Sequence, residues 1–280
     1  MSLRFLPVAQ RLGIPLVAHF HGLDLSSGLN NRWYHWSLRR WIGDFAATIV
    51  VGNHQASLLE SWEVPRDKVH VIPCGVPVDE FQPAETPKPG PLRIVAVTRL
   101  VPQKGVDLSI QAFSCVRRLV PGVRFDVVGD GPERPSLEAL ARDLGIENDV
   151  VFHGPLAQSD VRQVLMSADV FLQHSIRRSG WVEGFGVSVT EAAASGLPVV
   201  VSDCGGLTDQ VLDHVNGIVV PEGDVSATAR ALVELLTDAD KRRTYGAAGR
   251  RQASEKFDTP QQIVRLEDVL LEAISDRASQ

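Results

Sequence analysis

The sequence predicts a doubly wound α/β fold built on parallel sheets, and two patterns along the chain support this prediction. Short runs rich in valine, isoleucine and leucine alternate almost throughout with stretches of helical periodicity. The runs are continuously apolar, as in parallel strands that helices cover on both faces. Ligands of such folds bind at the carboxyl ends of the strands, so the loops that follow the strands are the first candidates for a functional site.

The individual elements follow from these patterns in chain order. Apolar residues at helical spacing, beginning with Leu3 and Leu6, predict a short first helix that ends at Gly13. Apolar runs predict strands at residues 15–20, 47–51, 69–72, 93–98, 124–129, 149–154, 169–173, 197–202 and 217–220. The clearest predicted helix has one apolar stripe formed by Val106, Ile110, Phe113, Val116 and Val120.

A proline-rich segment, FQPAETPKPGPL at residues 81–92, predicts a linker, because prolines neither pair in a sheet nor continue a helix. We therefore expect a partial Rossmann-like domain at residues 1–82, a linker at 83–92, a complete domain at 93–257, and a C-terminal helix at 258–280 that packs back on the first domain. Three predicted strands are too few for a stable open sheet, and no strand precedes the first helix. Upstream residues of a longer chain, a second chain, or the C-terminal helices are the alternatives for completing the first domain.

Composition excludes several classes of protein. The 280 residues are 44% hydrophobic and 22% charged, as is usual for globular chains, and the net charge of -6 gives no basic surface for nucleic acid. No apolar run is long enough to span a membrane, and the first residues lack the pattern of a signal peptide. The three cysteines are far apart, so we expect a reducing, cytoplasmic location without disulfides or a zinc site.

Two glutamates mark the most informative stretch, WVEGFGVSVTEAAASG. The residues after Gly186 predict a helix, whose free first-turn N–H groups favour an anion such as phosphate. Gly184 and Gly186 let this backbone approach a ligand closely. Glu183 and Glu191 would accept hydrogen bonds from hydroxyls on either side of the phosphate, which suggests a nucleotide sugar. The alternative is that one glutamate caps a helix and the other is a solvated surface group.

Two cations follow the first strand of the second domain, in VTRLVPQKG. Arg99 and Lys104 would lie in a strand-to-helix loop, where this fold binds its ligands. A guanidinium and an ammonium suit a diphosphate and can stabilise it as a leaving group. Taken alone, the pair would more simply be solvated loop residues. Together with the two glutamates it favours a ligand site.

Several motifs in series resemble retaining glycosyltransferases of family 4, which have the GT-B fold of two Rossmann-like domains. They are TRLVPQKG, VVGDGPER, VVFHGPL, EGFGVSVTEAAASGLPVVVSDCGG and VNGIVVPEGD, in the family's order between Arg93 and about Asp224. Before the linker, VAHFHG and IPCGVPVDEF are similar to further segments of the family. The resemblance implies a GT-B fold in which the amino-terminal, acceptor-side domain is incomplete.

The resemblance also implies roles for individual residues. Glu191 would bind the ribose hydroxyls, and Glu183 the hydroxyls of the transferred sugar. Arg99 and Lys104 would hold the diphosphate. His21 would lie over the donor sugar, and His19 is a further candidate on the same strand; without the resemblance, a histidine at a strand end would more simply belong to the core.

The remaining donor contacts implied by the resemblance come mostly from backbone. The backbone N–H groups of the segment at the helix tip would assist in binding the diphosphate, and two glycines of GDGP would line the nucleotide pocket. The segment from Phe152 to Gly154 would lie beside the base. These donor-binding residues are Gly184, Phe185, Gly186, Val187, Ser188, Gly129, Gly131 and His153.

The implied activity is that of a hexosyltransferase. It would transfer a sugar with retention from a UDP- or GDP-sugar to a glycan or lipid-linked acceptor in envelope or exopolysaccharide assembly, with no cofactor and usually no metal. The chain departs from the family by lacking the glycine-rich loop of the first strand, by Cys74 in place of a common asparagine, and by Asp209 in place of a common glutamate. The missing loop normally helps to shape the acceptor site.

An aromatic and basic segment, NNRWYHWSLRRWIGDF, predicts a helix at residues 30–45. One stripe, Tyr34, Leu38, Trp41 and Phe45, should belong to the core. Trp33 and Trp36 fall with Arg40 on another face, which suits a peripheral contact at the inner face of the plasma membrane or a lipid-linked acceptor. Simple packing against other elements is the alternative that we favour for this face.

Two other classes of function remain open from the sequence. The chain could be a non-catalytic nucleotide-sugar-binding subunit that depends on a second polypeptide for its acceptor half. A nicotinamide-dependent dehydrogenase is weakly supported, because no predicted strand is followed by GxGxxG.

Overall fold

The computed structural model describes residues 5–84 and 90–278, and its strands form two parallel sheets. The smaller sheet has three strands in chain order: β1 (Val17–Phe20), β2 (Ala47–Val50) and β3 (Val69–Val71). Within the described chain, no strand pairs with the outer edge of β1.

The larger sheet has six strands in the order β6-β5-β4-β7-β8-β9, and all of its pairings are parallel. Its strands are β4 (Arg93–Val97), β5 (Arg124–Val128), β6 (Val150–Gly154), β7 (Val170–Gln173), β8 (Val199–Ser202) and β9 (Gly217–Val220). The order reverses between β4 and β7, so the chain winds first in one direction and then in the other. The carboxyl ends beside this switch point are the expected place for a ligand.

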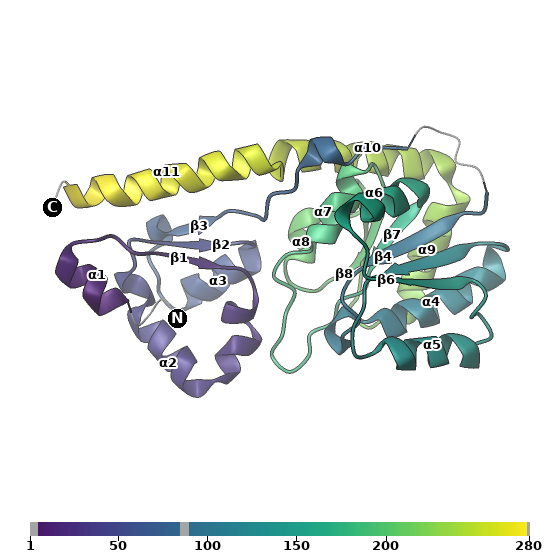
Figure 1. Cartoon of the computed structure of the whole chain (residues 1–280), viewed down its shortest axis with the longest axis horizontal. Coiled ribbons are helices and arrows are strands. Elements are labelled where there is room, and N and C mark those ends of the chain that lie inside the picture. The colour runs from purple at the N-terminus through teal and green to yellow at the C-terminus, as the bar shows by residue number, and fades with distance from the viewer. Residues whose placement is uncertain (1–4, 85–89, 279–280) are drawn as a thin grey trace.

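Helices connect and cover the strands of both sheets (Figure 1). They are α1 (Leu6–Leu12), α2 (Arg32–Trp41), α3 (Asn53–Ser61), α4 (Val106–Leu119), α5 (Arg134–Asp143), α6 (Gln158–Ser167), α7 (Val187–Ala194), α8 (Leu207–Gln210), α9 (Val225–Thr237), α10 (Ala239–Lys256) and α11 (Thr259–Ala278). On the large sheet, α4, α5 and α9 pack on one face, and α6, α7 and α10 contribute to the buried cluster on the other.

The predicted α/β fold with parallel sheets is confirmed. All nine predicted strands are present, and their ends differ from the prediction by no more than two residues. They are found so readily because β2, β7 and β8 are buried at every position, which makes their sequences apolar except at Thr48, Gln173 and Ser202. The first helix ends as expected, at Gly13 in the left-handed conformation, whereas Leu3 lies outside the described residues.

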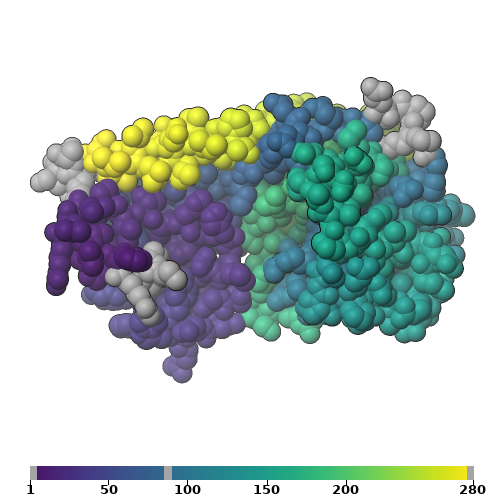
Figure 2. Space-filling model, viewed as in Figure 1, coloured from purple at the N-terminus to yellow at the C-terminus, as the bar shows by residue number. Residues whose placement is uncertain are grey.

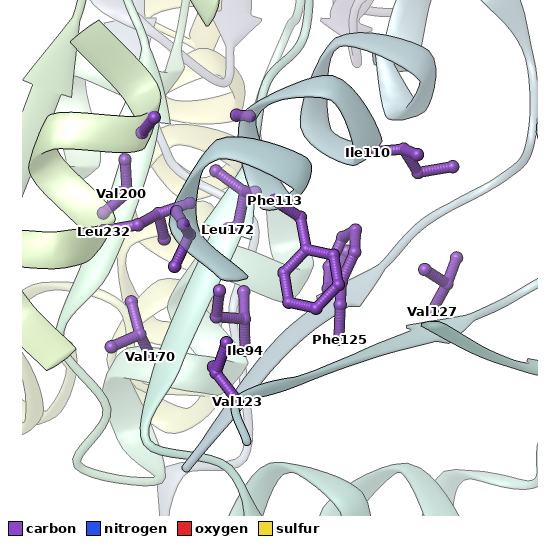
Figure 3. Packing of buried hydrophobic residues seen from close by; sticks show 14 of the residues in the cluster. Ile94, Ile110, Phe113, Val123, Phe125, Val127, Val170, Leu172, Val200 and Leu232 are labelled. Carbon is purple, nitrogen blue, oxygen red and sulfur yellow. The ribbon is translucent and has the colours of Figure 1, made fainter. Parts of the chain in front are cut away.

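The main core lies between the large sheet and the helices on one of its faces. The predicted stripe of α4 forms part of it: Phe113 packs on Phe125 of β5 with ring centroids 5.5 Å apart (Figure 3). Each fully buried phenylalanine contributes about 1.5–3 kcal/mol to folding. This packing holds β4 and β5 rigidly beneath the loops that follow them.

The last helix, α11, crosses from the large domain to the small one and lies along the three-stranded sheet (Figure 1). Its Val269 is buried in a cluster with Ala47 and Ile49 of β2 and with Ile72, and Leu266 packs against the same cluster. The C-terminal helix therefore supplies one layer of the small domain.

Two details of the sequence analysis need comment. Trp41 does not belong to the core as predicted: its side chain is 38% exposed, and the Arg40 guanidinium lies 4.8 Å from its ring centroid. The reason is that the buried face runs through Leu38, Ile42 and Phe45, which are 1%, 2% and 1% exposed, so that Trp41 lies beside this face and not on it. Residues 85–89 of the predicted linker lie outside the described residues. Among residues 5–84 and 90–278, no helix has the length and apolar character needed to cross a bilayer.

Candidate functional site

The predicted site residues of the large domain follow the carboxyl ends of neighbouring strands. Arg99 and Lys104 follow β4, Gly129 and Gly131 follow β5, and Glu183 lies on the long connection from β7 to α7. These three strands are adjacent in the sheet, in the order β5-β4-β7. The parallel topology therefore gathers the three loops at one edge, beside the switch point.

Lys104 and Glu183 form a direct ion pair at this edge. The Lys104 Nζ lies 2.5 Å from Glu183 Oε2, and the two side chains are only 14% and 7% exposed. The ammonium also lies 5.4 Å from the centroid of the Trp181 ring, a distance typical of cation–π contact. Two charges so far from water are stable only because each has the other as partner. The sequence predicts that Lys104 binds the diphosphate and Glu183 the transferred sugar of one ligand. In the structure the two side chains are in direct contact.

The tip of α7 offers part of the predicted anion site. Helix geometry leaves the N–H groups of Val187 and Ser188, in the first turn, without intrahelical acceptors. The N–H of Gly186 is engaged: it donates to Gln210 Oε1 at 2.9 Å, and Gln210 Nε2 donates back to the Gly186 carbonyl at 2.8 Å. Gln210 thus orients the glycine loop, and the groups left for an anion are those of the first helical turn.

The ring of Phe185 packs between the two domains. It lies in a small buried cluster with Val51 and Phe257, with its ring centroid 5.7 Å from that of Phe257. Its side chain therefore anchors the glycine loop to the other domain, and only its backbone remains for a ligand at the helix tip.

Glu191 lies one turn inside α7, where its Oε1 accepts a hydrogen bond of 2.8 Å from Gln158 Nε2 of α6. Burial raises the pKa of the Glu191 carboxyl, while the Gln158 hydrogen bond and the nearby Arg162 act in the opposite direction. A partly buried carboxylate with one amide partner keeps acceptor capacity for the hydroxyls of a ligand.

Three of the predicted glycines are places where backbone segments touch. A Cβ on Gly129, whose φ is +121°, would lie 1.9 Å from the carbonyl oxygen of Thr98, and a Cβ on Gly131 would lie 2.3 Å from that of Leu100. The loops after β4 and β5 are therefore in direct backbone contact. A Cβ on Gly184 would lie 2.7 Å from the carbonyl oxygen of His21, so this glycine allows the two domains to meet.

His153, predicted beside the base, has a partner within the protein. Its Nε2 lies 2.7 Å from Asp126 Oδ1 on β5, and Asp126 Oδ2 accepts a hydrogen bond of 3.0 Å from Arg93 Nη1. The backbone at the end of β6 is close to the site instead, because the Gly154 carbonyl accepts a hydrogen bond from the Gly129 N–H. The backbone at Gly154 is therefore beside the loop that begins at Gly129, whereas the imidazole of His153 is occupied by Asp126.

The small domain faces this edge with the carboxyl ends of β1 and β2. His21 is exposed directly after β1, and its ring centroid lies 4.1 Å from that of His19. The pKa of His19 is lowered by burial and by the charge of His21. After β2, Asn53 donates from its N–H and from Nδ2 to the two carboxylate oxygens of Asp209, at 2.7 and 2.9 Å, across the domain boundary. Figure 2 shows the two lobes in contact, with a hollow between them.

Arg99, the other predicted cation, lies in the same loop as Lys104 but makes no ion pair with Glu183. It is exposed, and within the described residues its side chain has no hydrogen bond or ion pair. Also within the described part of the chain, no three His, Cys, Asp or Glu side chains gather closely enough to hold a metal ion.

Sequence reasoning missed Gln173 and Ser175, which are buried beside Glu183 and donate to its Oε2, each at 2.9 Å. It also missed Gln158 and Gln210, the partners of Glu191 and Gly186. A signal existed for the first two: polar residues interrupt the apolar pattern where β7 ends. For the other two no local signal exists, because their partners are distant in sequence.

Comparison with known families gives two matches that together span most of the chain. The family model for glycosyl transferases group 1 matches residues 78–252, and that for glycosyltransferase family 4 matches residues 2–80. The boundary between them falls just before the proline-rich linker.

Relatives of similar sequence include GDP-mannose-dependent alpha-(1-6)-phosphatidylinositol monomannoside mannosyltransferases. That of Mycobacterium tuberculosis (strain ATCC 25618 / H37Rv) is 33% identical over 246 residues, which cover 84% of this chain and 64% of the relative. That of Mycolicibacterium smegmatis is 31% identical over 284 residues, which cover 94% of this chain and 72% of the relative. The chain thus spans about two thirds of the length of these proteins.

Solved structures with the same fold include Anabaena Alr3699/HepE in complex with UDP and the sucrose-phosphate synthase tll1590 from Thermosynechococcus elongatus. The TM-scores are 0.86 and 0.82, each at 22% identity and with 96% of this chain covered; the match covers 75% and 70% of those chains. At this identity the likeness shows the fold, and it confirms the predicted GT-B architecture.

Proposed function

The chain belongs to the glycosyl transferases group 1 family, and we propose that it transfers a hexosyl group, with retention, from a nucleoside diphosphate sugar to a lipid or glycan acceptor. The observation that carries this proposal is the buried Lys104–Glu183 pair at the carboxyl ends of β4 and β7, close to the first turn of α7. It combines a cation suited to a diphosphate with a carboxylate suited to sugar hydroxyls.

Each part of the donor has a group of matching chemistry in this proposal. Lys104 binds the diphosphate together with Arg99 and the first-turn N–H groups of α7, and these charges stabilise the departing nucleotide. Glu191 accepts hydrogen bonds from the ribose, and Glu183 from the transferred sugar. His21 approaches the sugar from the small domain. The acceptor oxygen attacks from the same face of the sugar as the leaving group, which yields retention.

We propose GDP-mannose as the first donor to test and UDP-sugars as the second. The mycobacterial relatives are GDP-mannose-dependent enzymes, and the structural neighbour from Anabaena is in complex with UDP. A phosphatidylinositol-type lipid is the corresponding first acceptor class, because the same relatives are named for such acceptors.

A peripheral, inner-leaflet position fits such a lipid acceptor. Trp33 and Trp36 on α2 are 65% and 64% exposed, and Arg39 and Arg40 follow on the same helix. Exposed tryptophans with neighbouring arginines suit the interfacial region of an anionic bilayer. This exposure favours the membrane interpretation of the segment over the packing interpretation.

A second candidate is a nucleotide-sugar-binding subunit that needs another polypeptide for its acceptor half. The observation in its favour is that β1 lies at the edge of the small sheet, where no described strand pairs with its outer side. An unpaired parallel edge readily accepts a further strand.

Proton NMR of donor turnover tests the proposal and separates the candidates. The protein is incubated with GDP-mannose or UDP-glucose and vesicles containing phosphatidylinositol, and the first sugar linkage or free sugar to appear is assigned as α or β. Initial formation of the α anomer from these α-linked donors is expected. Initial formation of the β anomer would contradict retention. Nucleotide binding without any turnover would favour the subunit.

A further inference from the structure

The end of β7 is polar and fully buried, which is unusual for a central strand. Gln173, the last residue of β7, and Ser175, two residues further on, are 4% and 0% exposed, and Gln173 Nε2 donates to Ser175 Oγ at 3.2 Å. A buried amide or hydroxyl is costly unless it is hydrogen-bonded. Both of these side chains find their partner in Glu183.

Glu183 Oε2 is the centre of this arrangement. It accepts hydrogen bonds from Lys104 Nζ at 2.5 Å, from Gln173 Nε2 at 2.9 Å and from Ser175 Oγ at 2.9 Å. Gln173 also reaches the other part of the site, because its Oε1 accepts a hydrogen bond of 3.1 Å from Ser188 Oγ in the first turn of α7. One amide therefore links the carboxylate to the helix tip.

A diphosphate at the helix tip would compete with Glu183 for Lys104. Without the ammonium, Glu183, a residue that is 5% exposed, would lose its charged partner. A buried carboxylate is costly unless hydrogen-bond donors surround it. Gln173 and Ser175 are the neutral donors in place.

We propose that Gln173 is a positioning residue for the donor sugar: it keeps Glu183 hydrogen-bonded and oriented while Lys104 turns to the diphosphate. This role rests on the proposed function, since it requires a nucleoside diphosphate sugar in this site. A purely structural role, in which Gln173 only fills the core, makes a different prediction for one substitution.

Gln173→Glu is that substitution, because it preserves shape but donates only when the new carboxyl is protonated. At low pH the protonated side chain can still donate to Glu183. At high pH two carboxylates would face each other, and they would share one proton or repel. Gln173→Leu removes the donor at every pH and serves as the comparator at the same position.

Other titratable groups face Glu183 from the surrounding elements. Lys104 after β4 pairs with Glu183, and His54 on α3 and Cys204 after β8 interact electrostatically with it. Arg177 after β7 acts on the same His54 and Cys204. All of them are unchanged in both variants. A pH dependence that appears in Gln173→Glu and not in Gln173→Leu is therefore due to the substituted carboxyl.

The experiment measures how much the sugar contributes to binding. This contribution is the ratio of Kd for GDP to Kd for GDP-mannose, and likewise the ratio for UDP and UDP-glucose. Calorimetry gives each Kd at pH 5.5 and at pH 8.5. We expect Gln173→Leu to reduce this ratio about tenfold, as for one hydrogen bond to a charged group, with little change for the nucleoside diphosphate alone. At pH 5.5, Gln173→Glu should behave like the unmodified chain. At pH 8.5, the same variant should behave like Gln173→Leu.

Gln252→Leu is the matched control, since Gln252 is also buried in the large domain but its partner is Asn216. It should keep the sugar contribution. The positioning role is overturned if the Kd ratio of Gln173→Glu is the same at both pH values. It is also overturned if Gln252→Leu reduces the ratio as much as Gln173→Leu does. Failure of the unmodified chain to bind any of the four ligands would instead overturn the proposed function itself. Thermal unfolding of each variant verifies that it is folded.

Discussion

At Glu191, burial and hydrogen bonding act on one carboxylate in opposite directions. Burial is the larger influence, so its pKa is raised above that of an ordinary glutamate. If Glu191 accepts hydrogen bonds from the ribose, protonation removes part of its acceptor capacity. The affinity for nucleotide should then begin to fall at a higher pH than an ordinary glutamate would allow.

Glu191→Gln tests this role. At pH 7 we expect the variant to bind GDP or UDP about tenfold more weakly, which is the usual effect of losing a hydrogen bond to a charged group. The variant should also lose the part of the pH dependence between pH 7 and pH 5 that Glu191 causes. Calorimetric titration across this range measures both effects. Glu267→Gln, on the exposed side of α11, is the control, and equal binding by all three proteins would contradict the assignment.

His174 is buried at the end of β7 and is held neutral by its partners. Its Nε2 accepts a hydrogen bond of 2.9 Å from the Gly223 N–H, which leaves the proton on Nδ1, 2.9 Å from Thr228 Oγ1. Burial lowers the pKa of His174 below its ordinary value of 6.5, although three nearby carboxylates oppose the shift. In the unfolded chain the imidazole takes up its proton at the ordinary pH.

The free energy of unfolding should therefore depend on pH through His174. Above pH 6.5 the His174 imidazole is neutral in the folded and in the unfolded chain, and the full stability is present. As the pH falls below 6.5, only the unfolded chain gains a proton at His174. The free energy of unfolding therefore falls until the pH has passed the pKa of His174 in the folded chain. Urea unfolding between pH 7.5 and 5 should show a smaller loss for His174→Gln than for the unmodified chain. Parallel losses in the two proteins would contradict this account.

Candidate site residues could be proposed from the sequence only where they lie near a strand end or a helix tip, as Lys104, Glu183 and Glu191 do. Their partners could not, because the pairing of Glu183 with Lys104 or of Glu191 with Gln158 depends on how distant segments fold together. The same limitation applies to His153, whose bond to Asp126 joins two strands.

Among the elements, the loops after β4 and β5 depend most strongly on a single glycine. Gly129 has a positive φ of +121°, and a Cβ there would lie 1.9 Å from the Thr98 carbonyl oxygen. Gly122 also has a positive φ, +81°, but no atom lies within 4 Å of its would-be Cβ. The two positions differ in the close backbone contact, and they share the strained backbone conformation.

Gly129→Ala should therefore destabilise the protein more than Gly122→Ala. The shared cost of a left-handed conformation is about 1–2 kcal/mol, and the forced separation of the two loops should add at least about 2 kcal/mol at Gly129. Equilibrium unfolding in urea measures both variants. Equal losses of stability would mean that the two loops can separate without cost.

The elements were predictable from the sequence to a large extent, and the reason is burial. Both faces of the strands in the large sheet are covered, so each strand appears as a continuous apolar run. The prediction was wrong at Trp41 because the buried face continues from Leu38 to Ile42, which leaves Trp41 beside it. Periodicity specifies the middle of a helix face, and packing decides which residues at its edge are covered.

For the whole molecule, the sequence could not predict the order of the strands or the contacts between domains. The order β6-β5-β4-β7-β8-β9 and the contact between Gly184 and His21 are long-range properties of the fold. In the same way, the role of α11 is decided by its position along the small sheet (Figure 1). Its Val269 is 7% exposed there, whereas Leu271 on the same helix is 62% exposed.

Val269→Asp should therefore destabilise the small domain, because a charge would be buried among apolar residues without a partner. We expect a loss of at least about 3 kcal/mol, and a change within about 0.5 kcal/mol for Leu271→Asp at the exposed position. Thermal unfolding followed by circular dichroism measures both. Equal melting temperatures for the two variants would indicate that α11 does not stabilise the small domain.

The most direct test of the central claim, that Lys104 and its neighbours at the switch point bind the diphosphate of a sugar nucleotide, is a thermal-shift titration with GDP, UDP and their sugars. A ligand that binds only the folded state, at a hundredfold excess over its Kd, raises the free energy of unfolding by about 2.7 kcal/mol. We predict such a shift for at least one of these ligands, its loss in Lys104→Ala, and its retention in Lys241→Ala, where a lysine paired with Glu234 lies on another surface. A folded protein that responds to none of them, or a Lys104→Ala variant with an unchanged shift, would contradict the claim.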